Sequence, residues 1–364
     1  MHIEIYSIKG FTGSALRAKL EHALAARRLP YEVWEITDIK RFIQLRLPAV
    51  PAIKVEDKIF IHPEGGNLDE TVEKVITHIE GKYAPSVLVP IDFSAESLHA
   101  LDYAGEVANA FHFGLTLTHI HQSIYDPVSG GACDVLVQQE NQMMLEDLAN
   151  EMREKRIVEG NMLPVDVHIE SGETASSLIQ LSLHDAHYKM IVMATKAKDT
   201  TMRRLFGTVS NRVAQHSAKP VMIIPPDAPV RFPMRWTIGF DEELLMSPSL
   251  DQLLTYHDRL HISMQFAHIL TSNEPVERAL VNELQSQLDK HPNGVAGLGC
   301  ELLSASETPI DEILFNKVKK DQSDILVLLS HRRSFIESVQ HSSVIRHAIQ
   351  QPPVPVMIMP LQSV

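Results

Sequence analysis

Short apolar runs alternate with amphipathic stretches through residues 86–360, and this pattern predicts strands separated by helices. In the first part of this region the apolar runs lie at 87–91, 115–120, 165–169, 190–194 and 221–224. Strands that are apolar at nearly every position are typical of a parallel sheet covered by helices on both faces. We therefore predict an α/β fold with an open, mostly parallel sheet.

Two consecutive stretches repeat the same order of motifs, which indicates two copies of one domain. Asp92 and Asp241 each end an apolar run, and they lie 149 residues apart. His119 and His268 lie in the next apolar run of each copy, again 149 residues apart, which suggests a shared structural role. Farther along the offset falls by about 15 residues, because part of 138–160 has no counterpart in the second copy.

The first block, residues 1–84, has an α/β pattern of its own. It predicts strands at 2–6 and 31–36, a helix at 14–28, a hairpin of two short strands at 53–55 and 58–62, and a closing helix at 67–81. Asn67 is the expected cap of that last helix, since its side chain can accept a hydrogen bond from a free backbone N–H. We therefore predict three domains, at 1–84, 85–230 and 231–364.

Composition narrows the classes of function. The formal net charge is −13 over 364 residues, and an acidic surface repels the phosphates of a duplex, so we expect no nucleic-acid partner. No apolar run is long enough for a membrane helix, and the N-terminus lacks the form of a signal peptide. Only two Cys are present, which excludes a disulfide framework. We expect a soluble, cytoplasmic protein with no membrane partner.

Two loops would meet at the carboxyl edge of the first copy's sheet, where open parallel sheets bind ligands. The first loop carries Asp92 at the end of the first strand. The second follows the fourth strand with the spacing Ala194, two residues, Ala197, nine residues, Gly207-Thr208. This constellation resembles the universal stress protein family, whose ATP-binding members carry a Gly-x2-Gly-x9-Gly-(Ser/Thr) loop there and an Asp closing the first strand.

The resemblance covers residues 86–226 and 235–360. It implies two open, mostly parallel five-stranded α/β sandwiches of the adenine nucleotide α-hydrolase-like type. It also implies an adenine-nucleotide site in the first copy, for ATP with Mg, in which backbone N–H groups of the loop and the next helix start would face the phosphates. The residues implied for this site are Pro90, Asp92, Ile120, Met193, Ala194, Lys196, Ala197, Arg203, Gly207, Thr208 and Val209.

The loops also depart from the family motif. Two of the three motif glycines are alanine in the first copy, and a methyl group hinders close approach of the backbone to phosphate. The second copy keeps no motif glycine, so we expect no nucleotide there and expect Asp241 to be a helix cap. No Walker-type Lys-Ser/Thr pair or catalytic base is evident, so we expect a non-enzymatic stress-response or signalling protein with at most slow ATP hydrolysis. The alternative left open is a ligand-free interaction scaffold.

The family resemblance also bears on assembly. Universal stress protein domains dimerise through their last strands, so the resemblance implies that segments 220–224 and 355–360 pair within this chain. Such pairing would bury two exposed sheet edges against each other. It leaves open whether the tandem forms a further homodimer.

Residues 1–81 resemble the thioredoxin fold, nearer to glutaredoxin. Pro51 precedes the hairpin and Gly65-Gly66 precedes the last helix; in that family the proline is cis. The redox motif would fall at 10–14, but no Cys lies in this block, and thiol–disulfide exchange requires a thiolate. We therefore expect no redox chemistry or redox cofactor. Docking of a protein partner along the Pro51 edge and a passive appendage remain as alternatives.

A metal site is not expected. His184 and His187 lie three residues apart in a predicted helix, which would put them on one face. The sequence supplies no third ligand beside them.

Overall fold

The computed structural model describes residues 2–8, 11–26, 32–45, 47–55, 58–83, 85–122, 132–155, 157–158, 161–195, 208–270, 274–291, 296–304, 308–330, 348 and 352–361. The chain forms two compact units, Met1–Ala84 and Pro85–Val364, and each is described by itself.

The first unit is a four-stranded mixed sheet with helices α1 (Phe11–Ala26), α2 (Ile39–Gln44) and α3 (Leu68–Tyr83). Its strands are β1 (His2–Tyr6), β2 (Glu32–Ile36), β3 (Ala52–Val55) and β4 (Lys58–Ile61), in the order β2-β1-β3-β4. β1 runs parallel to β2 and antiparallel to β3, which pairs antiparallel with β4. The four strands and the helices α1 and α3 are the ones that the apolar pattern predicted, with ends shifted by a few residues.

Apolar positions one helical turn apart build the core of this unit. Leu16, Leu20 and Leu24 of α1 are fully buried, as are Val75 and Ile76 of α3, and the two helices pack together over the sheet. The side chain of Asn67 accepts a hydrogen bond of 2.9 Å from the Asp69 N–H, which confirms it as the cap of α3. The peptide bond between Val50 and Pro51 is cis.

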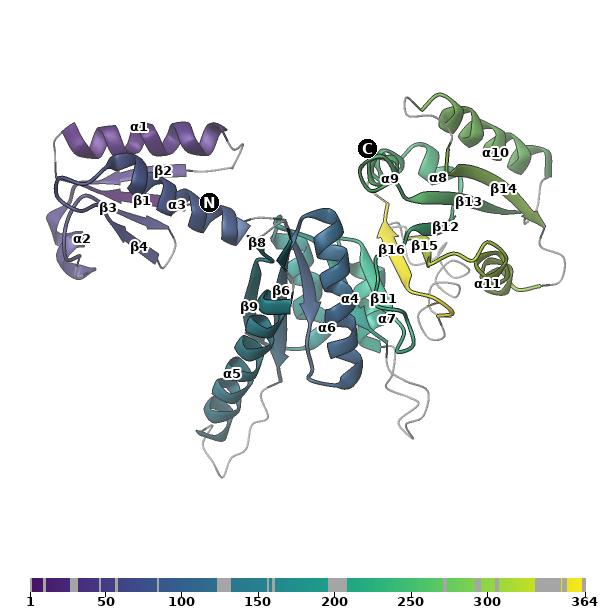
Figure 1. The fold of residues 1–364 in the computed structure, drawn as a ribbon, viewed down its shortest axis with the longest axis horizontal. Helices are drawn as coiled ribbons and strands as arrows, with labels where there is room; N and C mark the ends of the chain where they lie inside the picture. The colour runs from purple at the N-terminus through teal and green to yellow at the C-terminus, as the bar shows by residue number, and fades with distance from the viewer. Residues whose placement is uncertain are drawn as a thin grey trace. The chain divides into compact units, whose positions relative to one another are not determined.

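The second unit contains one ten-stranded sheet, in the order β14-β13-β12-β15-β16-β11-β10-β5-β6-β9. The two strands at its centre, β11 and β16, are labelled in Figure 1. The first half supplies β5 (Ser86–Pro90), β6 (Gly114–His121), β9 (Val165–Ser171), β10 (Tyr188–Ala194) and β11 (Val221–Ile224). The second supplies β12 (Arg235–Gly239), β13 (Ser263–Leu270), β14 (Leu298–Ser304), β15 (Ile325–Ser330) and β16 (Val356–Pro360). All neighbours are parallel except β11 and β16, which pair antiparallel.

Helices cover both faces of this sheet, as its apolar strands predicted. One face packs against α4 (Ala95–Phe111), α5 (Ala132–Lys155), α9 (Pro248–Leu260) and α10 (Glu274–Asp289). The other packs against α6 (Thr174–His184), α7 (Thr208–His216) and α11 (Ile310–Lys320). Alternate residues of β5 show why both faces need a cover: Val87 and Val89 are fully buried on the first face, and Leu88 on the second.

The extra length of the first half lies beyond its second strand. α5 has 24 residues, whereas α10, which follows the matching strand of the second half, has 16. After α5, the short strands β7 (Ile157–Val158) and β8 (Asn161–Met162) form an antiparallel pair that the sequence did not predict. The second half instead has one short additional helix, α8 (Glu242–Leu245), before α9.

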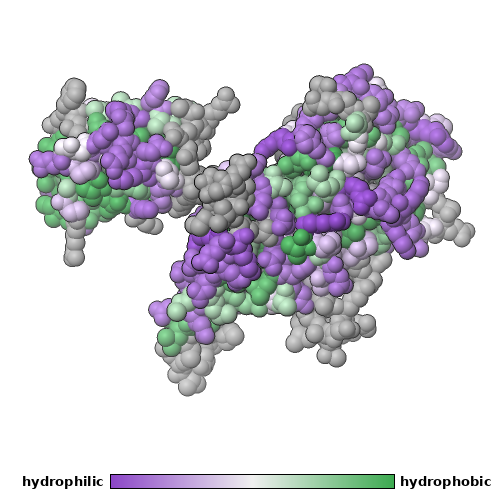
Figure 2. Space-filling view, viewed as in Figure 1, coloured by the Kyte–Doolittle hydropathy of each residue, from purple (hydrophilic) through white to green (hydrophobic). Residues whose placement is uncertain are grey.

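The N-terminal half of α5 carries apolar side chains that the fold leaves exposed. Val135, Leu136 and Met143 are 55%, 65% and 67% exposed, and Figure 2 shows green side chains in this region. Elsewhere the visible face carries hydrophilic and hydrophobic side chains side by side. Among the described residues, none of the helices is both long and apolar enough to cross a membrane.

The β11–β16 junction joins the two halves through buried side chains. Val221, Met222 and Ile223 lie opposite Ile358, Met357 and Val356, and all six are 0% exposed. This is the pairing of the last strands that the resemblance implied, and it makes one continuous sheet out of the two predicted five-stranded sheets. Two apolar sheet edges are thereby removed from solvent.

We predict that Met222→Ala lowers the free energy of unfolding by about 2–4 kcal/mol, because it leaves a cavity opposite Met357 at the junction. Chemical denaturation of the full chain measures this loss. Met246→Ala is the matched control: this methionine is 79% exposed, and its removal should change stability by less than about 0.5 kcal/mol. Equal, small effects of the two variants would contradict a buried junction.

Candidate functional site

The carboxyl edge of the first half brings together the ends of the neighbouring strands β10, β5 and β6. Pro90 is the last residue of β5, Ile120 lies one residue before the end of β6, and Met193 and Ala194 end β10. Ile120 and Met193 are buried, whereas Pro90 and Ala194 are half-buried. Four of the predicted site residues thus lie at one edge of the sheet.

The predicted phosphate loop follows β10. Four of its site residues fall outside the described part of the chain, namely Lys196, Ala197, Arg203 and Gly207. The description resumes at Thr208, which begins α7, the helix start that the resemblance implied. Val209, the next residue, packs half-buried against the apolar cluster that contains Met193.

Ser210 holds the start of α7 beside the end of β10. Its hydroxyl donates a hydrogen bond of 3.5 Å to the carbonyl of Ala194, and its side chain is largely buried. The N–H of Thr195, the residue after β10, donates to the Ile224 carbonyl of β11 at 3.0 Å. Both ends of the loop are therefore fixed at the same edge. The sequence analysis missed Ser210, although a serine in the first turn of a helix was a usable signal.

Asp92 lies in the turn between β5 and α4. Its Oδ1 accepts hydrogen bonds from the backbone N–H and the hydroxyl of Ser94, at 3.1 and 2.5 Å. Ser94 in turn caps α4, since its Oγ accepts from the Ser97 N–H at 3.2 Å. Between them Phe93 adopts a left-handed backbone with φ of 61°. The exposed carboxylate of Asp92 is thus held at the start of a helix, next to the edge described above.

His119 connects this turn to β6. Its Nδ1 lies 2.8 Å from the carbonyl oxygen of Ile91, and its Nε2 lies 3.2 Å from the amide nitrogen of Asn141 on α5. A carbonyl can only accept, so Nδ1 carries the proton and donates it, and a neutral Nε2 accepts from Asn141. The ring also lies 5.1 Å from that of Phe93. His119 therefore sets the path of the chain from Ile91 to Phe93.

His268 does the same in the second half. Its Nδ1 lies 2.8 Å from the carbonyl oxygen of Phe240, the residue that corresponds to Ile91, and its ring lies 5.3 Å from the Phe240 ring. This geometry confirms the shared structural role expected for His119 and His268. Asp241 accepts from the Glu243 N–H at 3.0 Å and caps α8, which confirms the predicted helix cap.

An ion pair ties α7 to α6 on the other side of the loop. Arg212 of α7 lies 3.0 Å from Glu173, the cap residue of α6. Hydrogen bonds from the hydroxyl and N–H of Ser176 are the main reason that the pKa of Glu173 falls from 4.5 to about 2, with further lowering by the Ala175 N–H and Arg212. α7 is thus joined to α6 by the carboxylate of Glu173, which stays ionised in mildly acidic solution.

The expected pairing of His184 and His187 on one helix face is wrong. α6 ends at His184, and Asp185 closes it in an extended conformation. His187 lies beyond the helix, where its Nδ1 contacts the carboxylate of Asp185 and its ring packs on Tyr188. Among the described residues, no cluster of three or more His, Cys, Asp or Glu side chains could hold a metal ion.

Comparison with known proteins identifies the first half of the second unit. Residues 85–225 match the model of the Universal stress protein family. Residues 85–225 are a universal stress protein domain. This domain spans β5 to β11 and therefore contains the whole edge built around Pro90, Asp92, Ile120 and Ala194. None of the curated proteins matches the chain.

Solved structures extend the likeness in fold beyond the matched residues. A universal stress protein from Archaeoglobus fulgidus shares 17% sequence identity, with a TM-score of 0.55 over 76% of this chain and 98% of that protein. A putative universal stress protein from Pseudomonas aeruginosa shares 12%, with a TM-score of 0.51 over 77% of this chain and 95% of that protein. At these identities the likeness is one of fold. Because the matches cover 76% and 77% of this chain, they include residues outside 85–225.

We predict that Glu173→Gln lowers stability by about 1 kcal/mol at neutral pH, the usual contribution of a helix cap. The folded-state pKa is depressed, so this contribution is complete above about pH 5 and declines as the pH falls from 4.5 toward 2. Thermal unfolding of the wild type and the variant across this range measures the difference. Glu154→Gln, on the exposed surface of α5, is the control; a Glu173 effect that is independent of pH would contradict the assigned pKa.

Proposed function

We propose that this chain is a non-enzymatic, nucleotide-responsive protein of stress response or signalling, built from two universal stress protein-like domains and a thioredoxin-like domain, and located in the cytoplasm. The first half of the second unit has the strand order β9-β6-β5-β10-β11, and the second half has the matching order β14-β13-β12-β15-β16. The histidine–carbonyl bonds of His119 and His268 occur at the same place in both. These two correspondences support a tandem of one domain.

The proposed ligand is an adenine nucleotide, ATP with Mg, in the universal stress protein domain. The observation that carries this proposal is the position of the start of α7, which Ser210 holds against the end of β10. β10 is the neighbour of β5 in the sheet, and the turn with Asp92 follows β5. The first N–H groups of a helix lack partners within it and favour phosphate oxygens. Asp92, with an exposed carboxylate, would bind the adenine or ribose side, and Gly207 and Thr208 the far phosphates.

Bound nucleotide would act here as a signal and not as a substrate. Asp92 already accepts two hydrogen bonds from Ser94, and both nitrogens of His119 are engaged, by Ile91 and Asn141. Neither Asp92 nor His119 is therefore positioned to take a proton from an attacking water, so we propose at most slow hydrolysis of ATP. ATP would supply charge and contacts that stabilise the loop between β10 and α7.

The alternative is an interaction scaffold that binds no nucleotide. It is favoured by the two alanines in place of motif glycines, Ala194 and Ala197, and by the exposed apolar side chains in the N-terminal half of α5, such as Leu136 and Met143. On this alternative the carboxylate of Asp92 serves only the turn before α4.

For the first unit we propose docking of a protein partner. Trp34 of β2 and Ile39 and Ile43 of α2 are 55%, 61% and 71% exposed, and Ile39 and Ile43 lie one turn apart on the helix. Two exposed apolar side chains on one face of a helix favour a protein surface as partner. The absence of Cys from residues 1–84 leaves no thiol for redox chemistry there.

We predict that ATP with Mg raises the unfolding temperature of the full chain, because a ligand that binds only the folded state stabilises it. Asp92→Asn should weaken ATP binding at least about tenfold, since an asparagine keeps the turn but loses the charge. Ala194→Gly with Ala197→Gly should strengthen it, because the loop backbone can then approach the phosphates. Isothermal titration calorimetry measures both effects.

Asp241→Asn is the matched control, since it alters the corresponding cap of the second half, where no nucleotide is expected. It should leave ATP affinity unchanged. The absence of any heat or thermal shift at millimolar ATP, in both the wild type and the double glycine variant, would overturn nucleotide binding and favour the scaffold.

A further inference from the structure

A cavity of about 600 Å³ lies in the second unit, apart from the residues of the proposed nucleotide site. It is lined by the segment that connects β11 to β12, by α11, by the turn before β15, by the prolines before β16 and by Tyr103 of α4. Its volume is in the range of small-molecule sites, roughly 300–1,000 Å³. It shares none of its lining with the predicted nucleotide residues that the structure describes.

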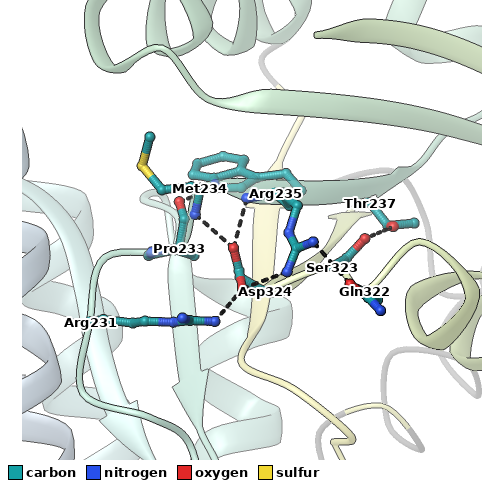
Figure 3. A network of polar contacts seen from close by, with 9 residues as sticks. Arg231, Pro233, Met234, Arg235, Thr237, Gln322, Ser323 and Asp324 are labelled. Atoms are coloured by element: carbon teal, nitrogen blue, oxygen red, sulfur yellow. Dashed lines mark hydrogen bonds and ion pairs between the residues drawn. The ribbon is translucent and has the colours of Figure 1, made fainter.

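Asp324 makes one wall of this cavity rigid. Its side chain is 12% exposed and accepts hydrogen bonds from Arg231 at 2.8 Å, from the Met234 N–H at 3.0 Å and from the Arg235 N–H at 2.9 Å (Figure 3). Beside it, the hydroxyls of Thr237 and Ser323 lie 2.7 Å apart. The carboxylate is therefore fully occupied by donors, and the connecting segment is fixed at the start of β12.

Tyr103 of α4 contributes to the lining of the cavity. The residue is 1% exposed, and its hydroxyl makes no hydrogen bond with any residue in the described part of the chain. Burial and the charge of Asp324 raise the pKa of Tyr103, so the hydroxyl keeps its proton and can donate. The hydroxyl can therefore donate a hydrogen bond to an acceptor inside the cavity.

The charges around the cavity favour an anion. Arg231, Arg235 and Lys319 are set against Asp227 and Asp324, which leaves one positive charge in excess on a chain whose net charge is −13. Lys319 forms no ion pair with the residues that the structure describes, and Arg231 uses only one terminal nitrogen on Asp324. Cationic donors thus remain for a ligand.

The rest of the lining is apolar and stiff. Six prolines contribute to it, together with Phe315 of α11 and Val354 before β16. The prolines are Pro225, Pro229, Pro233, Pro352, Pro353 and Pro355. A proline backbone is already restricted, so little conformational freedom is lost when a flat apolar group binds against it.

We propose that this cavity binds a small organic anion, an apolar ring bearing one carboxylate or phosphate, with Tyr103 donating a hydrogen bond to it and with Lys319 and Arg231 facing its charge. The ring would lie among the prolines and Phe315. This site is independent of the proposed nucleotide site, because it is formed by other residues and requires no phosphate loop.

The test uses calorimetry of the full chain with 1-naphthyl phosphate, 1-naphthoate and uncharged 1-naphthol. We expect one saturable site for at least one of the two anions, bound at least about tenfold more tightly than 1-naphthol. The preference between phosphate and carboxylate identifies the anionic group. Lys319→Glu should weaken the anion about tenfold, and Tyr103→Phe by roughly threefold to tenfold, the usual range for a lost hydrogen bond.

Two further variants separate this site from general apolar binding. Asn316→Trp places a large ring on the exposed surface of α11 at the cavity and should abolish the saturable binding. Lys290→Glu changes the same charge outside the cavity and should have no effect. Thermal unfolding confirms that each variant is folded. Equal affinity of the wild type, Asn316→Trp and Lys319→Glu, or equal affinity for the anions and 1-naphthol, would overturn the proposal.

Discussion

The antiparallel pairing of β11 with β16 is the contact on which the second unit depends. Each of these strands would otherwise be the apolar edge of a five-stranded sheet, and an unpaired edge invites aggregation. Their pairing buries Met222 against Met357 and makes both strands interior to a ten-stranded sheet. The unit is therefore one folded body, although each half repeats the order of the other.

That pairing also decides where the sites lie. Because β11 and β16 run in opposite directions, the carboxyl ends of β5, β10 and β11 lie at the same edge as the amino ends of β12, β15 and β16. The proposed nucleotide site and the cavity beside Asp324 therefore belong to one edge of the sheet. The carboxyl edge of the second half, with Asp241, lies at the opposite edge.

The pattern of apolar and polar residues predicted the features that depend on nearby residues in the sequence. The strands follow from apolar runs, the caps at Asn67 and Asp241 from short polar side chains before helices, and the role of His119 and His268 from their equal spacing. The pairing of the last strands came from family resemblance, since the runs alone do not say which edges meet.

Features that depend on long-range packing could not be predicted in this way. The α6 helix stops at His184 because Asp185 turns the chain, so the helical periodicity did not extend to His187. The bond from Ser210 to Ala194 requires the start of α7 to return to the end of β10. Tyr103 of α4 lies beside a cavity because the 225–235 segment passes next to it, and no local pattern shows this.

The same crossing explains why the cavity is not repeated. The two halves are related by topology, so the histidine–carbonyl bond occurs twice. A single connection, however, joins β11 to β12, and it carries Arg231 and the main-chain N–H groups that bind Asp324. A site built on that connection can exist only once, whatever the symmetry of the sheet. Duplication of a domain thus creates, at the join, a surface that neither copy has alone.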